Sequence, residues 1–422
     1  MVAKEGITIN NNTYLTSYQL IKVLNKAINS VDFRFLEHGN RVTYIMLNLM
    51  KASEKYTNED MLKICITSIF HDIGAYKVTE RDQLSDADRK APINHAIYGA
   101  LFIKNFSPLS KYYKIILAHH FTLEYYNEHN MEIISDLGLL LSFADYIDRV
   151  KMNDYKINVQ QIKQYYPEEY IQLYNKADSL YDFMNKLSDG RYINDMEIFF
   201  KDTFVSKEEV MDYCKMLAYA IDFRSEDTVI HTIMVEAISE QLAKRCYISD
   251  ERISLIKICA LLHDIGKISI PVEILEKPGK LTYEEFEIMK NHSKIGYDIL
   301  SELNMNEIRD IATLHHEKLD GSGYPFGLKG DEITKEMRIV AISDIISALI
   351  GSRSYKEGFS KEKIISILNE MVVRNKIDNN ITRLFINNYD CIIDEAMKAC
   401  ANTMEKYLNI KNEYEELLKI YK

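Results

Sequence analysis

Apolar residues recur at three- and four-residue spacing along most of the chain, which predicts amphipathic helices. Such runs occupy residues 16–50, 60–70, 168–187, 207–220, 227–246, 253–262, 307–314, 338–350 and 361–422. Thr282 and Glu285 have the spacing of a capping box, which predicts a further helix beginning there. We therefore expect an all-α protein. At 422 residues, two domains are the better expectation.

Histidines and aspartates lie at or between these helices in the same order twice. The first series is His38, His71, Asp72, His95, His119, His120 and Asp145, and the second is His231, His263, Asp264, His292, His315, His316 and Asp344. Most intervals agree closely, for example 71 − 38 = 33 against 263 − 231 = 32. We infer two homologous helical domains, at 1–155 and 223–422, joined by a helical connection at 156–222.

Composition narrows the functional classes. Hydrophobic residues make up 47% and charged residues 27%, and the formal net charge is −11. This acidity argues against general nucleic-acid binding, which needs clustered Lys and Arg. The 6 cysteines have no paired spacing, and neither a signal peptide nor a membrane-spanning run is evident. We expect a cytoplasmic protein.

The side chains of the second series are typical of a metal centre. Imidazoles and carboxylates suit Fe, Mn, Co or Zn, and the absence of cysteine argues against structural zinc. Asp227 precedes His231 by four residues and would share its helical face. This set is too large for one tetrahedral ion, so we expect at least two metals bridged by Asp264. A bridging hydroxide would then attack a phosphoester.

Glycines mark the segments next to these ligands. Gly74 and Gly266 suit the position after a helix C-terminus. In HHEKLDGSGYP, residues 315–325, two imidazoles and a carboxylate suggest a metal-binding edge. Gly321, Gly323 and Pro325 then predict an irregular loop beside the metal, because glycine permits positive φ and proline ends helices.

The second half resembles the HD-GYP domain, a branch of the HD superfamily of metal-dependent phosphohydrolases that hydrolyses cyclic dinucleotides. The resemblance rests on HDIGK at 263–267, NHSKIG at 291–296, HHEKLDGSGYPFGLKGDEI at 315–333 and SDIISALIGSRSYKEG at 343–358. It implies that the second series binds two metals, Fe or Mn. A third would need Asp227, which stands where trinuclear members carry glutamate.

The resemblance also implies contacts with substrate. Lys267 would contact the phosphate or assist departure of the leaving oxygen. The nucleotide itself would be held by Gly323, Tyr324, Pro325, Arg353 and Lys356.

The first half resembles the HD superfamily but departs from the GYP branch where substrate would be held. Ala75 replaces Lys267, and residues 119–126 contain no glycine loop. Arg34 stands at the position of Asp227, and Asp154 and Ile157 stand at those of Arg353 and Lys356. We expect a second metal site in a regulatory or scaffolding domain without efficient diester hydrolysis.

This tandem layout is similar to phosphodiesterases of cyclic GMP-AMP and cyclic di-GMP, which makes such a dinucleotide the expected substrate. Two alternatives remain open, namely a phosphohydrolase of another nucleotide and a non-catalytic signalling adaptor. The apolar face of the C-terminal helices either closes the second core or meets a partner, which could be a second copy or a signalling protein.

Overall fold

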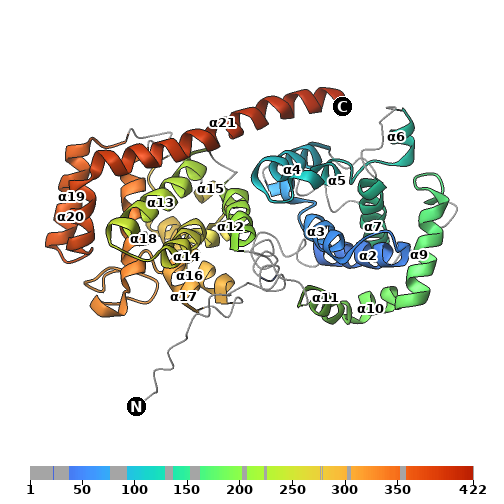
Figure 1. Ribbon diagram of the computed structural model, residues 1–422, viewed down its shortest axis with the longest axis horizontal. Helices are drawn as coiled ribbons and strands as arrows, with labels where there is room; N and C mark the ends of the chain where they lie inside the picture. Colours follow the sequence, from blue (N-terminus) through green and yellow to red (C-terminus); the bar gives the residue numbers. More distant parts are fainter. Residues whose placement is uncertain are drawn as a thin grey trace, which may run out of the picture.

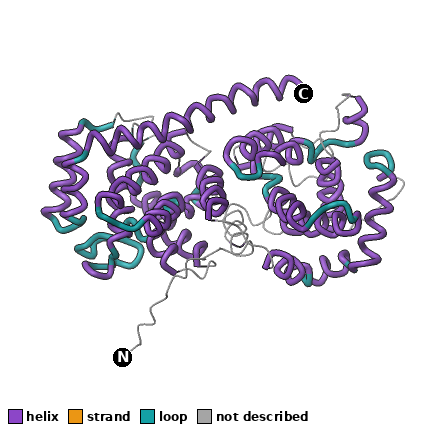
Figure 2. Tube along the Cα trace, in the orientation of Figure 1, coloured by secondary structure: helices purple, strands orange, loops and turns teal. Residues whose placement is uncertain are grey.

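The computed structural model describes residues 22, 38–76, 93–128, 136–152, 162–201, 207–222, 226–275, 277, 279–301, 306–351 and 358–421, and these form helices and loops without a strand (Figure 2). The predicted all-α class is confirmed. Arg34, Asp154, Ile157, Arg353 and Lys356 lie outside the described residues, as does the side chain of Asp227.

The first lobe carries the earlier ligand series, and its helices lie on the right in Figure 1. Its helices are α2 (His38–Ser53), α3 (Asn58–Ile69), η2 (Ile73–Tyr76), α4 (Ile93–Phe106), α5 (Tyr113–Leu117), α6 (Leu123–Glu128) and α7 (Asp136–Met152). Three further helices, α9 (Glu168–Tyr181), α10 (Phe183–Asp189) and α11 (Tyr192–Lys201), pack against α2.

The second lobe repeats this arrangement. Its helices are α12 (Lys207–Asp222), α13 (Glu226–Arg245), α14 (Asp250–Leu262), η5 (Ile265–Ser269), α15 (Val272–Leu275), α16 (Tyr283–Leu300), α17 (Asn306–Thr313), α18 (Lys335–Ile350), α19 (Lys361–Val373) and α20 (Asn379–Asn387). The succession α13, α14, η5, α16, α17, α18 matches α2, α3, η2, α4, α5, α7, and the same pairs of helices pack together. The predicted capping box at Thr282 and Glu285 begins α16.

Six of the predicted runs begin and end within three residues of an observed helix, namely 60–70, 207–220, 227–246, 253–262, 307–314 and 338–350. Residues 16–21 and 23–37 of the predicted run at 16–50 lie outside the described residues. The predicted run at 361–422 is three helices, and the one at 168–187 is two. The backbone of Asp182 adopts the left-handed conformation with φ 53°, which ends α9 and begins α10. Aspartate tolerates this conformation better than most residues, so the helix can break there without a glycine or proline to mark the position.

The C-terminal residues form one long helix, α21 (Tyr389–Tyr421), which crosses from the second lobe to the first (Figure 1). It packs against α13 and, further along, against α4. There, Lys104 forms an ion pair with Glu413, and Tyr98 meets Tyr414 with ring centroids 5.5 Å apart. The tail thus closes the second core, as one of our two alternatives held, and it also reaches the first lobe.

Gly74 and Gly266 do not end helices as we predicted. Each lies inside a 3₁₀ helix without a positive φ. A Cβ on Gly266 would stand 1.9 Å from the His292 carbonyl oxygen, and one on Gly74 would stand 2.0 Å from that of His95. The absent side chain therefore lets η5 approach α16, and η2 approach α4, which brings the His-Asp steps at 71–72 and 263–264 beside the next histidine.

Candidate metal centre

The second ligand series converges on one buried position. His231 comes from α13, His292 from α16 and Asp344 from α18, whereas the two adjacent pairs, 263–264 and 315–316, follow the ends of α14 and α17. His263 and His315 are fully buried, and His292 is 1% exposed. Imidazoles and carboxylates are rarely buried together without a compensating partner, so this convergence needs a chemical explanation.

Asp264 lies between two groups of histidines. Its Oδ2 is 3.0 Å from His263 Nε2 and 3.7 Å from His231 Nε2, while its Oδ1 faces His292 Nε2 at 3.3 Å. Donor atoms of His231, His263 and Asp264 lie within 4.8 Å of one another, as do those of His292, His315 and His316. Two adjacent clusters therefore meet at this carboxylate, which is the arrangement that a bridging ligand requires.

Backbone carbonyls orient the imidazoles. The Nδ1 atoms of His263, His292 and His315 lie 2.7, 2.6 and 2.9 Å from carbonyl oxygens three residues earlier. Each Nδ1 can donate to that carbonyl, which leaves Nε2 as the lone-pair donor toward the cluster. His231 is held differently, with Nδ1 2.9 Å from the Ser347 hydroxyl. This orientation of His ligands is usual at metal sites.

The protonation states of four of the five imidazoles suit metal ligands as well; the exception is His263, where burial would lower the pKa but the nearby Asp264 raises it. Burial lowers the pKa values of His231, His292 and His315, and it lowers the pKa of His316 to about 3. These four imidazoles are therefore neutral at pH 7. Burial would raise the pKa of Asp264, but His263 and Lys267 hold it well below its usual range. Neutral imidazole and ionised carboxylate are the states that bind metals.

The separations between donors fit divalent metals. Bonds of about 2.0–2.1 Å place neighbouring ligand atoms roughly 3.0–3.4 Å apart, close to the 3.0–3.3 Å between Asp264 and the Nε2 atoms of His263 and His292. His315 Nε2 is buried and has no hydrogen-bond partner in the described part of the chain. The donor set therefore fits a metal pair.

The segment after His316 is an irregular loop, as we predicted, and Gly321 has φ 81°. Our reading of Glu317 as part of the metal edge is wrong. Its carboxylate accepts from the backbone N–H groups of residues 326, 327 and 328 at 2.7, 3.1 and 2.9 Å. The buried Glu317 thus ties the end of the loop to its beginning. Gly323 lacks a positive φ and permits close contact instead, since a Cβ there would stand 2.4 Å from Glu317 Cα.

This loop places Tyr324 beside the metal-binding cluster. Its ring lies against His316 with centroids 4.7 Å apart, and Lys290 lies 5.7 Å from the Tyr324 centroid. Lys267 forms an ion pair with Asp264.

A further charged residue near the site, Lys318, was not among the predicted site residues. Burial lowers the pKa of Lys318, and the nearby Asp344 partly opposes this effect. The position of Lys318 two residues after the paired histidines was the available signal.

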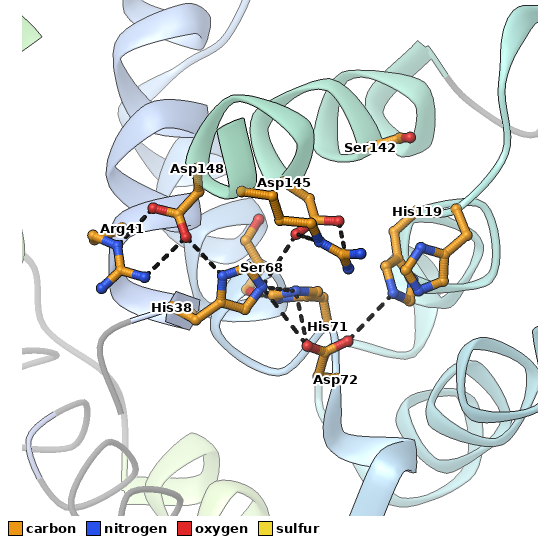
Figure 3. A network of polar contacts seen from close by, with 12 residues as sticks. His38, Arg41, Ser68, His71, Asp72, His119, Ser142, Asp145 and Asp148 are labelled. Carbon is orange, nitrogen blue, oxygen red and sulfur yellow. Dashed lines mark hydrogen bonds and ion pairs between the residues drawn. The ribbon is translucent and has the colours of Figure 1, made fainter. Parts of the chain in front are cut away.

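The first ligand series converges in the same way (Figure 3). Asp72 Oδ2 is 3.3 Å from His71 Nε2 and 3.8 Å from His38 Nε2, while Oδ1 is 3.4 Å from His95 Nε2 and 3.5 Å from His119 Nε2. His120 Nε2 lies 2.8 Å from His95 Nε2. Asp72 again joins two clusters that could each hold a metal.

The surroundings of the first ligand series differ from those of the second. Helix α6 begins three residues after His120, where the second lobe has its glycine loop. Two charged residues of α7, Asp148 and Arg149, contact the cluster through His38 and Asp145. Neither residue was among the predicted site residues, although their spacing of three and four residues from Asp145 places them on its face of the helix.

Two family models, both described as HD domain, match residues 35–150 and 214–381. The chain therefore belongs to the HD-domain proteins and carries two HD domains. None of the helices in the described ranges is long and apolar enough to cross a bilayer.

Particular relatives are phosphodiesterases by name. The 3'3'-cGAMP-specific phosphodiesterase 1 of Vibrio cholerae is 27% identical over 86% of this chain and 89% of its own. A cyclic di-GMP phosphodiesterase of Thermotoga maritima is 45% identical over 35% of this chain and 40% of its own. A crystal structure of a cyclic GMP-AMP specific phosphodiesterase of V. cholerae aligns over 92% of this chain and 98% of that one, with 17% identity and a TM-score of 0.54. At that identity the structural likeness concerns the fold.

Proposed function

We propose that this protein is a metal-dependent phosphodiesterase that hydrolyses a cyclic dinucleotide, cyclic GMP-AMP or cyclic di-GMP, in its second HD domain. The observation that carries the proposal is the placement of Asp264 between two histidine clusters, directly beside Lys267 and close to the loop of Tyr324. The names of the relatives supply the substrate class.

The ligands in this proposal are the second series: His231, His263, Asp264, His292, His315, His316 and Asp344, with Asp227 available for a third ion. We take Fe or Mn as the metal, because both accept mixed imidazole and carboxylate ligands. When bound, such a pair polarises a phosphoryl oxygen and lowers the pKa of attached water. The residues of the chain hold the two cations close together and exclude competing water by burial.

Substrate contacts come from residues at the edge of the cluster. Lys267 is placed to exchange its ion pair with Asp264 for a phosphate oxygen or the departing oxygen. Tyr324, flanked by Gly323 and Pro325, presents its ring beside His316. Because Glu317 fixes the backbone of this loop, the tyrosine is held in place before substrate arrives. Arg353 and Lys356 complete the proposed phosphate contacts.

In this proposal the chain divides into a degenerate HD domain at 1–155, a helical connection at 156–222 and a catalytic domain at 223–422. The first domain regulates or supports the second. It keeps the metal-binding series, but it has Ala75 where Lys267 stands and a helix in place of the loop.

The test is to load the purified protein with Mn²⁺ or Fe²⁺ and offer cyclic GMP-AMP, cyclic di-GMP and cyclic di-AMP separately. We expect linear products from at least one of the first two. The variant Lys267→Ala should bind metal normally and turn over at least about 100-fold more slowly. Failure of the metal-loaded protein to cleave any of the three would contradict the proposal and favour an adaptor.

A further inference from the structure

Two charged residues on α7 distinguish the first metal-binding cluster from the second. Asp148 and Arg149 lie three and four residues after Asp145, and the corresponding positions on α18, three and four after Asp344, hold Ser347 and Ala348. On the helix that carries the last aspartate of each series, the two sites therefore differ in charge at these two positions.

Arg149 forms a bidentate ion pair with the carboxylate of Asp145. Its Nε donates to Oδ1 at 3.0 Å, and its second terminal nitrogen lies 2.9 Å from Oδ2. A two-pronged pair of this kind engages both oxygens of the carboxylate in the plane where a cation would bind. The aspartate is only 6% exposed, so water screens the pair weakly.

Asp344, by contrast, faces imidazoles. Its Oδ1 is 3.3 Å from His231 Nε2, and its Oδ2 is 3.9 Å from His316 Nδ1. No lysine or arginine in the described part of the chain forms an ion pair with it. The residue one turn further, Ala348, has no side chain that could do so. This carboxylate remains available to a metal.

The neighbouring His38 is also engaged on both sides. Its Nδ1 lies 2.8 Å from Asp148 Oδ2, and its Nε2 lies 3.1 Å from Asp145 Oδ1. Arg41 donates to both oxygens of Asp148, at 2.6 and 3.0 Å, and fixes that carboxylate (Figure 3). At this corner of the site, His38, Asp145 and Asp148 thus form an ionic network with Arg41 and Arg149.

The opposite corner of the same cluster has kept its donors. The Nε2 atoms of His95 and His119 are 3.3 Å apart, and both are within 3.5 Å of Asp72 Oδ1. These separations match neighbouring ligands on one ion, whose bonds would be about 2.0–2.1 Å long. His120 Nε2 adds a fourth donor at 2.8 Å from His95 Nε2.

We propose that the first HD domain binds a single metal ion, through Asp72, His95, His119 and His120, and that the guanidinium of Arg149 takes the place of a second ion at Asp145. The inference rests on the proposed metal-binding role of the two series. It explains the inactivity proposed for the first domain beyond loss of substrate contacts, because a guanidinium cannot activate water as a second metal does.

Two reciprocal substitutions test this proposal. Full-length chains loaded with Mn²⁺ are compared by native mass spectrometry, which counts bound ions. Arg149→Ala should bind one more ion per chain than the wild type. Ala348→Arg, at an exposed position of the second domain, should bind one fewer. Arg191→Ala, which removes an exposed arginine from its pairs with aspartates, is the matched control and should leave the count unchanged.

Electron paramagnetic resonance assigns the ions. The wild type should show the signal of an isolated Mn²⁺ together with that of a coupled group, and Arg149→Ala should lose the isolated signal. Unchanged counts in a folded Arg149→Ala chain, or unchanged counts in Ala348→Arg, would overturn the inference while leaving the proposed function intact. If the wild type bound no Mn²⁺ at all, both would fail.

Discussion

The two HD domains share a framework and differ at the positions around it. Both place an aspartate between two groups of histidines, and both use a glycine, Gly74 or Gly266, to bring a 3₁₀ helix against the next helix. In the described part of the chain, the second domain alone adds a lysine beside that aspartate and a tyrosine loop beside the paired histidines. The first fills one corner with Arg149. The two domains therefore share the arrangement of their ligand series and differ in the charged and aromatic side chains beside it.

The largest expected effect comes from removing metal. Chelation followed by dialysis should lower diesterase turnover by more than about 1,000-fold, because the pair supplies both the nucleophile and charge stabilisation. Stepwise return of Mn²⁺ should restore turnover as the second domain fills. Recovery that instead followed loading of the first domain, measured in a chain with His315→Ala, would reverse the assignment of the two domains.

A smaller effect is expected from Glu317→Gln. The amide keeps the size of the carboxylate but can no longer serve as an ionised acceptor for the three backbone N–H groups at 326–328. We expect kcat/KM to fall about 10- to 100-fold through displacement of Tyr324, with metal content unchanged. Glu362→Gln, at an exposed carboxylate on α19, is the control. Loss of metal from Glu317→Gln would instead indicate that Glu317 is a metal ligand.

The shared framework predicts matched losses of stability. Gly266→Ala and Gly74→Ala should each destabilise their own domain by at least about 2 kcal/mol, because the new Cβ would meet backbone at 1.9 and 2.0 Å. Thermal unfolding should show a drop of roughly 4 °C or more. Gly351→Ala, whose Cβ would meet only the Ser347 carbonyl oxygen at 3.3 Å, should change little. Markedly unequal effects at the two matched glycines would break the comparison.

The smallest effect concerns pH. In the metal-free protein, burial would lower the pKa of His38, but its hydrogen bonds to the carboxylates of Asp145 and Asp148 raise it to about 10 from 6.5. A raised pKa means that this contribution to stability is complete below pH 6.5 and is lost as pH rises through 10. Burial lowers the pKa of His231, so protonation of this histidine at low pH would destabilise the folded second domain. In chelator, the first domain should therefore unfold at a lower temperature at pH 10 than at pH 7, and His38→Gln should reduce that difference.

Helical periodicity and the duplicated series were sufficient to predict the class of fold and the convergence of each ligand set, because both are properties of residue order. Contacts between elements could not be predicted from residue order. Gly266 and Gly74 look like helix-ending residues in sequence, and only the approach of two backbones reveals their purpose. Glu317 looks like a ligand because it follows two histidines, yet the turn of the loop directs it to backbone amides.

Arg149 illustrates the same limit. One residue after Asp148 on a helix, it reads as an ordinary surface charge, and the spacing that links it to Asp145 is common on helices. Its meaning depends on the carboxylate at position 145 being buried in a ligand cluster. The crossing of α21 onto the first lobe likewise follows from contacts between residues far apart in the chain, such as Lys104 and Glu413.

The most direct test compares one substitution at the two equivalent aspartates. The rate of linear dinucleotide formation is measured for metal-loaded Asp264→Asn and Asp72→Asn under identical conditions. We predict that Asp264→Asn loses more than about 1,000-fold in turnover and that Asp72→Asn stays within about threefold of the wild type. Equal losses in the two variants, or turnover that survives in Asp264→Asn, would contradict the assignment of catalysis to the second domain.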